Sequence, residues 1–190
     1  MELIARGAEA DIYKAEIFGI MAIIKLRVVK RYRIKDLDLK IRRSRSINEA
    51  KIMIKAYDNG VNVPRVLLVT DKLIAMEYID GETFSEKHSS IIDKIAAQVA
   101  KLHSIDIIHG DLTTRNILVR DNKPYIIDFG LASISKNIED KAMDLIVLER
   151  SLGDDLFHRF MDDYRNIIYN ADQILERISE IKKRVRYAER

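Results

Sequence analysis

Cysteine and tryptophan are absent from the chain, and proline and glycine are scarce, with 2 and 7 residues among 190. Without cysteine, the chain forms no disulfide and no thiolate metal site. No apolar run approaches the roughly twenty residues of a membrane-spanning helix, so we expect no contact with a membrane. The chain starts with Met1 and Glu2 and no long apolar run follows, so no signal peptide is predicted. Together these absences favour a cytoplasmic protein.

Hydrophobic residues make up 47% of the sequence, which suits one packed domain or two small lobes around a cleft. The net charge is only +3, but the basic residues are unevenly placed. Residues 25–45 contain ten Lys or Arg and two Asp, and the last fourteen residues contain six basic and two acidic side chains. Such clusters indicate an acidic partner such as RNA or an acidic protein, although solvated helix faces explain either cluster equally well.

The stretch from Ile108 to Gly130 contains three side chains whose spacing is informative. Asp111 lies five residues before Asn116, and Asp128 lies twelve residues after Asn116. Between Asn116 and Asp128, two short apolar runs flank a turn-forming segment, which is typical of a β-hairpin. We expect such a hairpin to bring the oxygen atoms of Asn116 and Asp128 close together.

Phosphoryl transfer is a chemistry that needs such a set of side chains. Mg²⁺ prefers oxygen ligands and usually takes one or two of them from protein, which suits Asn116 and Asp128. Asp111 is then the separate carboxylate that orients an attacking hydroxyl or water. The order of these residues resembles the catalytic loop and the Asp-Phe-Gly segment of protein kinases. Gly110 departs from that pattern, because most protein kinases have here an Arg that contacts a phosphorylated activation loop.

Strands are expected at residues 3–5 and 12–17, with a tight loop between them. Backbone N–H groups of such a loop can approach phosphate oxygens closely. We therefore predict nucleotide contacts at Arg6, Gly7, Ala8, Glu9 and Ala10. Gly7 is the only glycine of the loop, so the glycine-rich pattern of protein kinases is not met. Taken alone, the loop is explained more simply as a plain hairpin turn.

Lys25 lies near the end of an apolar run in a third expected strand, at residues 20–26. It resembles the strand lysine of protein kinases that contacts the α- and β-phosphates, although a strand lysine can also simply extend into water. The interpretation depends on a carboxylate partner, for which Glu49 is the candidate. Glu49 either caps a helix that starts near Ser46 or projects from a longer helix, over residues 37–57, and pairs with Lys25. We favour the second arrangement.

A second hairpin is expected at residues 66–76, and the segment after it is compatible with the hinge between two kinase lobes. In such a hinge, backbone groups hydrogen-bond the adenine edge. The Glu77 carbonyl and the Ile79 N–H group are the predicted adenine contacts, with Met76 at the back of the pocket.

Four helices are expected after the hinge, because apolar residues recur there at helical spacing. They cover residues 91–102, with Ser89 or Ser90 as the cap, and then 139–152, 154–169 and 171–186. His103 is expected to end the first of these helices without a role in chemistry. His109 is expected to hold the catalytic loop by packing and hydrogen bonding, and Asp144 is expected to face that loop. Only 60 residues follow Gly130, which leaves little room for a peptide-docking surface.

The whole chain resembles the small atypical kinase or ATPase subunit of the KEOPS complex, a family similar to RIO-type kinases. The match rests on the motif from Ile108 to Asn116, on the Asp-Phe-Gly segment, and on Lys25, Arg45 and Glu49. The segments at residues 7–10, 77–81 and 140–145 complete it.

The resemblance implies an α+β fold, namely a two-lobed, minimal protein-kinase-like domain over residues 1–190. A small β-rich N-lobe with one long helix is expected at residues 1–77 and a hinge at residues 78–81. A reduced, mainly helical C-lobe is expected at residues 82–190. Its C-terminal tail is basic, but looser than the dense Arg/Lys cluster usual in the family.

The same resemblance implies an enzyme that binds ATP and Mg²⁺. Such an enzyme phosphorylates itself on Ser or Thr, or hydrolyses ATP, in support of tRNA threonylcarbamoyladenosine modification. The implied partners are the threonylcarbamoyl transferase subunit, on the C-lobe, and a small regulatory subunit, on the N-lobe. The basic clusters make tRNA a further candidate partner.

Two other functions remain as alternatives. A small-molecule phosphotransferase of the aminoglycoside-kinase kind shares the His-Gly-Asp motif, but it needs a larger C-lobe to build its substrate pocket. A non-catalytic scaffold for tRNA or protein partners fits the basic clusters. The presence of Lys25, Asp111, Asn116 and Asp128 together argues against a scaffold.

Overall fold

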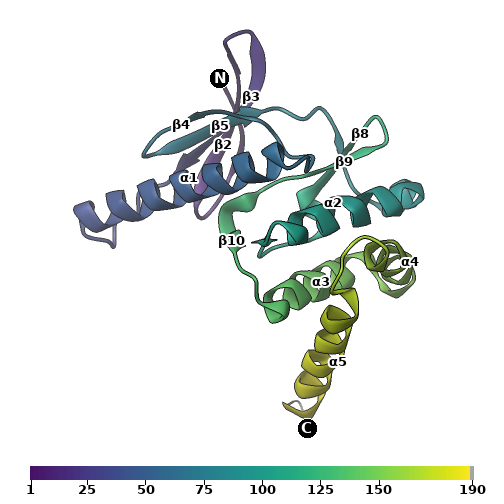
Figure 1. The fold of residues 1–190 in the computed structure, drawn as a ribbon. Helices are drawn as coiled ribbons and strands as arrows, with labels where there is room; N and C mark the ends of the chain where they lie inside the picture. Colours follow the sequence, from purple (N-terminus) through teal and green to yellow (C-terminus); the bar gives the residue numbers. More distant parts are fainter. Residues whose placement is uncertain (189–190) are drawn as a thin grey trace.

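The structure is a computed structural model that describes residues 1–188, and it consists of two lobes (Figure 1). The first lobe is built on a five-stranded antiparallel sheet in the order β1-β2-β3-β5-β4. Its strands are β1 (Glu2–Arg6), β2 (Ala10–Ile17), β3 (Ile20–Arg27), β4 (Val66–Val69) and β5 (Leu73–Glu77). Phe18 and Gly19 both have positive φ and form the two-residue turn between β2 and β3, as expected of a tight hairpin.

The helix α1 (Lys35–Asp58) crosses this sheet and is the one long helix of the first lobe (Figure 1). It starts eleven residues before Ser46, which confirms the favoured arrangement, in which Glu49 projects from a longer helix, and excludes the alternative of a capping box at Ser46. Ser46 is buried in the middle of the helix, where its hydroxyl has no hydrogen-bond partner among the described residues. The helix ends at Asp58 and the chain leaves it at Gly60, which has a φ of 73°, as the Asn-Gly pair predicts.

The second lobe is mainly helical. Its helices are α2 (Ile92–Ser104), α3 (Ile138–Leu152), α4 (Asp154–Arg165) and α5 (Ala171–Ala188). Its short strands are β6 (Glu82–Thr83), β7 (Ile107–Ile108), β8 (Ile117–Arg120), β9 (Lys123–Ile126) and β10 (Ser133–Ile134). The last two residues of the predicted basic tail, 189 and 190, lie outside the described part of the chain.

Two boundaries in the second lobe differ from the prediction. Neither Ser89 nor Ser90 caps α2, because a 3-10 helix (Glu86–Ile91) precedes it and Ser85 forms the capping box with His88. The helix predicted to reach residue 169 ends at Arg165, and the following turns lead directly into α5. In both places a local turn with its own hydrogen bonds replaces a turn of α-helix.

The predicted hairpin after the catalytic loop is confirmed. Ile117 of β8 pairs with Ile126 of β9, and Asp121 and Asn122 form the turn with φ values of 52° and 55°. Asn and Asp tolerate this left-handed backbone better than most residues. The hairpin sets the spacing between the residues that precede it and those that follow it.

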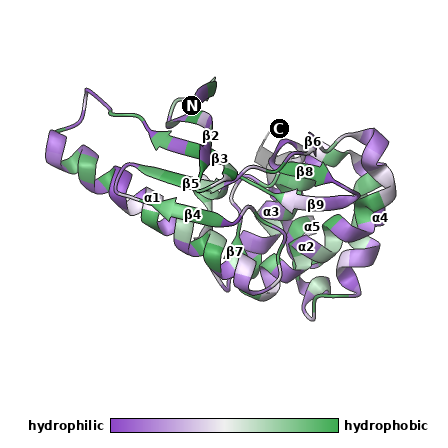
Figure 2. Ribbon diagram, turned by 90° about the horizontal axis from the view of Figure 1, so that it is seen from above, coloured by the Kyte–Doolittle hydropathy of each residue, from purple (hydrophilic) through white to green (hydrophobic). Residues whose placement is uncertain are grey.

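One continuous apolar core joins the two lobes, from Ala50 and Ile52 of α1 to Ile178 of α5. Figure 2 shows apolar residues on strands of both lobes and mixed apolar and polar residues along the helices. Within the described residues, no helix combines the length and apolar character that a membrane crossing requires.

Leu102 and Leu37 form a matched pair for testing this core. Leu102 is fully buried on α2, whereas Leu37 on α1 is 50% exposed. We expect Leu102→Ala to lower the free energy of unfolding by about 2–5 kcal/mol, because it leaves a cavity. Leu37→Ala is expected to change it by less than about 0.5 kcal/mol. Urea denaturation measures both, and equal losses would contradict the described core.

Candidate active site

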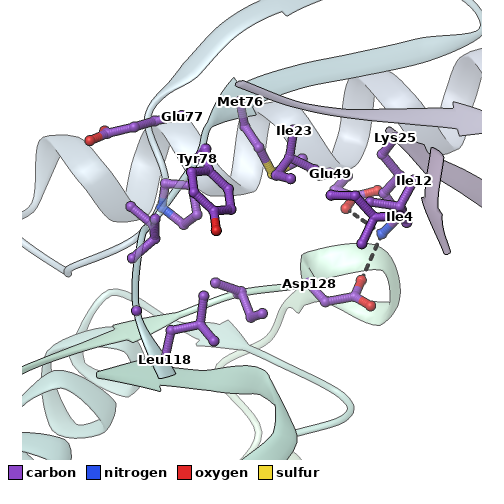
Figure 3. A pocket seen from close by; sticks show the side chains of 14 residues that line it. Ile4, Ile12, Ile23, Lys25, Glu49, Met76, Glu77, Tyr78, Leu118 and Asp128 are labelled. Atoms are coloured by element: carbon purple, nitrogen blue, oxygen red, sulfur yellow. Dashed lines mark hydrogen bonds and ion pairs between the residues drawn. The ribbon is translucent and has the colours of Figure 1, made fainter. Parts of the chain in front are cut away.

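An apolar cavity of about 350 Å³ lies between the two lobes, under the sheet of the first lobe (Figure 3). Met76, Glu77 and Ile79, which the sequence predicts at an adenine site, are among its lining residues. The remaining apolar lining comes from both lobes and was not predicted from the sequence: Ile4, Ile12, Ile23, Pro64, Tyr78, Leu118 and Ile127. Side chains alternate between the two faces of a strand. This alternation could have predicted that Ile12 of β2 and Ile23 of β3 lie on the face of the sheet that lines the cavity.

The segment after β5 is tied to its surroundings at several points. The Tyr78 N–H group donates to the Met21 carbonyl at 2.9 Å, and the Tyr78 ring turns towards the cavity. The Glu77 side chain points away from the cavity in Figure 3, which leaves backbone atoms to face it. A Cβ on Gly81 would lie 2.8 Å from the Val119 carbonyl oxygen, so only glycine fits at this crossing between the lobes.

A second cavity of about 420 Å³ adjoins the first, because Ile12, Lys25 and Asp128 line both. The predicted loop residues, from Arg6 to Ala10, line this cavity together with Asp111 and Gly130. Charged side chains are concentrated here: Arg6, Glu9, Lys25, Arg27, Arg45, Asp111 and Asp128. An apolar space that continues into a charged one suits a ligand with a flat base at one end and phosphates at the other.

Lys25 lies where the two cavities meet. Its Nζ atom is 2.8 Å from Glu49 Oε1 and 2.6 Å from Asp128 Oδ1 (Figure 3). The predicted ion pair between Lys25 and Glu49 is therefore present. Arg27 binds the other carboxylate oxygen of Glu49, a second partner that the sequence did not predict. Glu49 is only 2% exposed, so these two cations compensate the burial of its charge.

Asp128 remains ionised in this setting. Burial by itself would raise the pKa of its carboxyl group, but the charge of Lys25 and its hydrogen bond act in the opposite direction. With a further hydrogen bond from the Gly130 N–H group, the pKa of Asp128 is lowered from its ordinary value. The backbone of Asp128 is left-handed, with a φ of 62°, which places a strained residue at the site.

Asn116 lies beside Asp111, and a backbone hydrogen bond connects it to the residue that precedes Asp128. Its side-chain nitrogen donates to the backbone and side-chain oxygens of Asp111, at 2.8 and 3.0 Å. The Ile127 N–H group donates to the Asn116 carbonyl at 2.9 Å, next to Asp128 in sequence. The amide oxygen of Asn116 and a carboxylate oxygen of Asp128 are thereby left as oxygen donors that suit Mg²⁺.

Within residues 1–188, no three His, Asp or Glu side chains are grouped so that they could hold a metal ion. Asn116 and Asp128 offer two oxygen donors, which suits a cation that takes two protein ligands and completes its shell with water or phosphate, as Mg²⁺ commonly does. They do not fit a zinc-type site with three or four protein ligands.

The catalytic loop is held by a buried carboxylate, as predicted. Asp144 of α3 is 2% exposed and accepts hydrogen bonds from the N–H groups of His109 and Gly110, at 2.6 and 2.8 Å. His103 lies 3.4 Å from the same carboxylate and bonds the Tyr164 hydroxyl through its other nitrogen, at 2.8 Å. His103 is thus a buried link between helices, a role that sequence reasoning missed. Burial and the charge of Asp144 raise the pKa of Tyr164, so its hydroxyl stays protonated.

His109 holds the loop from the other side. Its Nε2 atom lies 2.9 Å from the Ile127 carbonyl oxygen, and the Asp111 N–H group lies 3.3 Å from its Nδ1 atom. A carbonyl accepts and an N–H group donates, so these partners suit a ring that carries a proton on Nε2. The ring also packs on Phe129, with centroids 4.9 Å apart, which confirms the predicted holding role.

Replacing Asp144 with Asn tests the anchoring of the loop. The amide presents a donor where the carboxylate accepts two N–H groups, so at least one of these becomes unpaired. We expect a loss of about 3 kcal/mol in the free energy of unfolding, measured in urea. Asp162→Asn, at an exposed position of α4, serves as the control and should have little effect. Equal behaviour of the two variants would contradict the anchoring role.

Gly110 occupies a position where no side chain fits. Its φ is 81°, and a Cβ atom would lie 2.5 Å from the Leu131 carbonyl oxygen. The same approach explains why this chain cannot have the Arg that protein kinases usually have here.

Gly110→Ala is therefore expected to displace the loop and lower phosphate release from ATP by roughly tenfold or more, whereas nucleotide binding is retained. Gly153→Ala is the matched control, because Gly153 has a φ of 80° but no heavy atom within 4 Å of its Cβ position. A similar loss of phosphate release in both variants would show that backbone strain alone causes the effect.

Known proteins that resemble this chain identify the class of protein to which it belongs. A family model for the RIO domain matches residues 21–151, a range that includes Lys25, Glu49, Asp111, Asn116 and Asp128. The chain belongs to the RIO domain family. Among solved structures, the Rio2 kinase from Chaetomium thermophilum covers the whole chain with a TM-score of 0.66 at 18% identity, which supports the predicted kinase-like α+β fold. A second structure of that kinase, of similar likeness, is described as a complex with ADP, Mg²⁺ and phosphoaspartate.

Proteins of similar sequence identify the chain more closely, because they include Bud32 subunits of KEOPS complexes. The chain is 39% identical to the KEOPS complex subunit Bud32 of Pyrococcus abyssi, an alignment that covers 100% of this chain and 98% of that protein. It is 35% identical to the corresponding subunit of Dictyostelium discoideum, of which it covers 82%. It is also 42% identical to a probable bifunctional tRNA threonylcarbamoyladenosine biosynthesis protein of Methanobrevibacter smithii, but spans only 36% of that longer protein.

Proposed function

We propose that this protein transfers the terminal phosphoryl group of ATP to a Ser or Thr hydroxyl, its own included, or to water. This activity would support tRNA threonylcarbamoyladenosine formation within a KEOPS-type complex. The observation that carries the proposal is the position of Lys25, between Glu49 and Asp128 at the junction of an apolar and a charged cavity.

The adenine is placed in the apolar cavity, beside the backbone of Glu77 and Ile79 and against Met76. Its flat ring suits a space lined by aliphatic side chains and the Tyr78 ring. The phosphates then extend into the charged cavity, where Lys25 and the loop from Arg6 to Ala10 lie. Such positioning and electrostatic stabilisation account for most of the catalysis in this class of reaction.

Asp111 is the proposed catalytic base. The hydroxyl or water oxygen attacks the γ-phosphorus while the bond to the β-phosphate oxygen of ADP breaks, and Asp111 takes the proton that the attacking group loses. Asn116 donates to Asp111 and fixes the orientation of its carboxylate. Asn116 and Asp128 would hold Mg²⁺, which when bound neutralises charge on the phosphates.

Relatives of this chain are subunits of KEOPS complexes, so its exposed surfaces are proposed to contact partners in such a complex. Exposed apolar residues on the second lobe suit contact with the threonylcarbamoyl transferase subunit: Leu131, Ile134 and Met143. Those near the start of α1 suit contact with the small regulatory subunit on the first lobe: Val29, Tyr32, Ile34 and Leu37. Basic side chains on α1 offer a tRNA contact: Lys40 and Lys51. The proposed site of action is the cytoplasm.

Turnover of ATP by Asp128→Ala tests the proposal. We expect release of phosphate and labelling of protein to fall by roughly a hundredfold or more, because the variant loses a proposed metal ligand and the partner of Lys25. Free and protein-bound phosphate are measured separately, with and without the transferase subunit.

Asp162→Asn, far from both cavities on α4, is the control and should match the wild type. Free phosphate that rises with the partner and is lost in Asp128→Ala identifies an ATPase, and label on protein identifies a kinase. Equal inactivity of wild type and Asp128→Ala in every mixture would contradict phosphoryl transfer and favour a scaffold.

A further inference from the structure

Arg45 is a residue of the charged cavity to which the mechanism above assigns no role. It lies on α1, one helical turn before Glu49, so the two side chains project from the same side of the helix. Like Lys25, Asp111 and Asp128, it lines the charged cavity. Its side chain pairs with Glu9, which belongs to the loop between β1 and β2.

Two of the other three cations that line the charged cavity, Lys25 and Arg27, already have strong partners. Lys25 binds both Glu49 and Asp128, and Arg27 binds Glu49 in a buried pair. Glu49 is only 2% exposed, so withdrawing these cations would leave a buried charge uncompensated. A triphosphate adds several negative charges to this cavity, so it requires a cation that can change partners.

The pair of Arg45 and Glu9 is able to exchange. The Arg45 and Glu9 side chains are 43% and 52% exposed, and ion pairs between exposed side chains contribute little to stability. A phosphate group offers the guanidinium two parallel hydrogen bonds and a higher charge than a single carboxylate. Exchange of Glu9 for phosphate is therefore favourable for Arg45.

One backbone donor of the loop is engaged within the loop itself. The Gly7 N–H group donates to the Ala10 carbonyl at 3.0 Å and so closes the turn of the loop on itself. A Cβ atom on Gly7 would lie 2.9 Å from that carbonyl oxygen, which shows how tight the turn is. This N–H group is therefore engaged within the loop, and a cationic side chain next to the loop can add positive charge for the phosphates.

We propose that Arg45 binds the terminal phosphates of a nucleoside triphosphate, and that Glu9 holds Arg45 until the nucleotide arrives. The proposal rests on the function proposed above, in which ATP is the substrate. It makes Arg45 a residue that distinguishes triphosphate from monophosphate, because a monophosphate placed by its adenine does not extend to the outer part of the charged cavity. Release of Glu9 then accompanies the binding of substrate.

Titration calorimetry with AMP and with a non-hydrolysable ATP analogue, each with Mg²⁺, tests this assignment without relying on turnover. Arg45→Gln is expected to weaken binding of the analogue by roughly tenfold or more and to leave AMP binding unchanged. Glu9→Gln is expected to do the opposite and tighten binding of the analogue severalfold, because Arg45 no longer has a competing anion. Arg45→Lys keeps the charge without the planar fork and should lie between wild type and Arg45→Gln.

Arg43→Gln is the matched control. Arg43 lies on the same helix and pairs with the exposed Asp71 at 3.2 Å, but it is not among the described residues that line either nucleotide cavity. It should bind both nucleotides as the wild type does.

The outcomes separate the two proposals. If the wild type binds neither nucleotide, the proposed function fails and the role of Arg45 fails with it. If the wild type binds both and Arg45→Gln retains the full preference for the analogue over AMP, only the role of Arg45 is overturned. Weaker analogue binding in Glu9→Gln would show that the pair positions the loop, and it would overturn the exchange. This last variant decides the question even if Arg45→Gln does not fold.

Discussion

The site depends on one shared cation. Lys25 of β3 contacts Glu49 of α1 and Asp128 from the second lobe, and so a single ammonium group joins three segments that are far apart in the sequence. Gly130 packs against this contact, since a Cβ atom there would lie 3.1 Å from the Lys25 Nζ atom. Removing the cation would leave Glu49 with Arg27 alone and Asp128 with no charged partner among the described residues. The same contact lowers the pKa of Asp128 and keeps it in the ionised form that the proposed Mg²⁺ site requires.

A second buried carboxylate holds the catalytic loop on the side of the site that belongs to the second lobe. Asp144 accepts the N–H groups of His109 and Gly110, and His103 connects it to Tyr164 of α4. The catalytic loop is thereby fixed to the helices of the second lobe, whereas Lys25 and Glu49 belong to the first. Hydrogen bonds and ion pairs within the chain hold both halves, which is the arrangement that electrostatic catalysis requires, because fixed dipoles and charges need no reorganisation during the reaction.

Short sequence patterns predicted the turns, because a turn depends on residues that are adjacent in the sequence. The hairpin after Asn116 and the turn at Gly19 follow from residues that favour left-handed backbone, and the structure has both. The pairing of Glu49 with Lys25 was predicted from chemistry instead, because a lysine on a strand needs a carboxylate partner. Local patterns failed where another interaction competed with them: Ser46 matches a capping box, yet α1 continues through it. The apolar cavity and the Glu9 pair of Arg45 depend on contacts between distant segments, which no window of the sequence contains.

The most direct test is a crystal structure with a non-hydrolysable ATP analogue and Mn²⁺ in place of Mg²⁺, in which anomalous scattering locates the metal. The account predicts adenine beside Glu77 and Ile79, phosphates next to Lys25, and a metal about 2.1 Å from oxygens of Asn116 and Asp128. A nucleotide bound outside the two cavities, or a metal that contacts neither Asn116 nor Asp128, would contradict it.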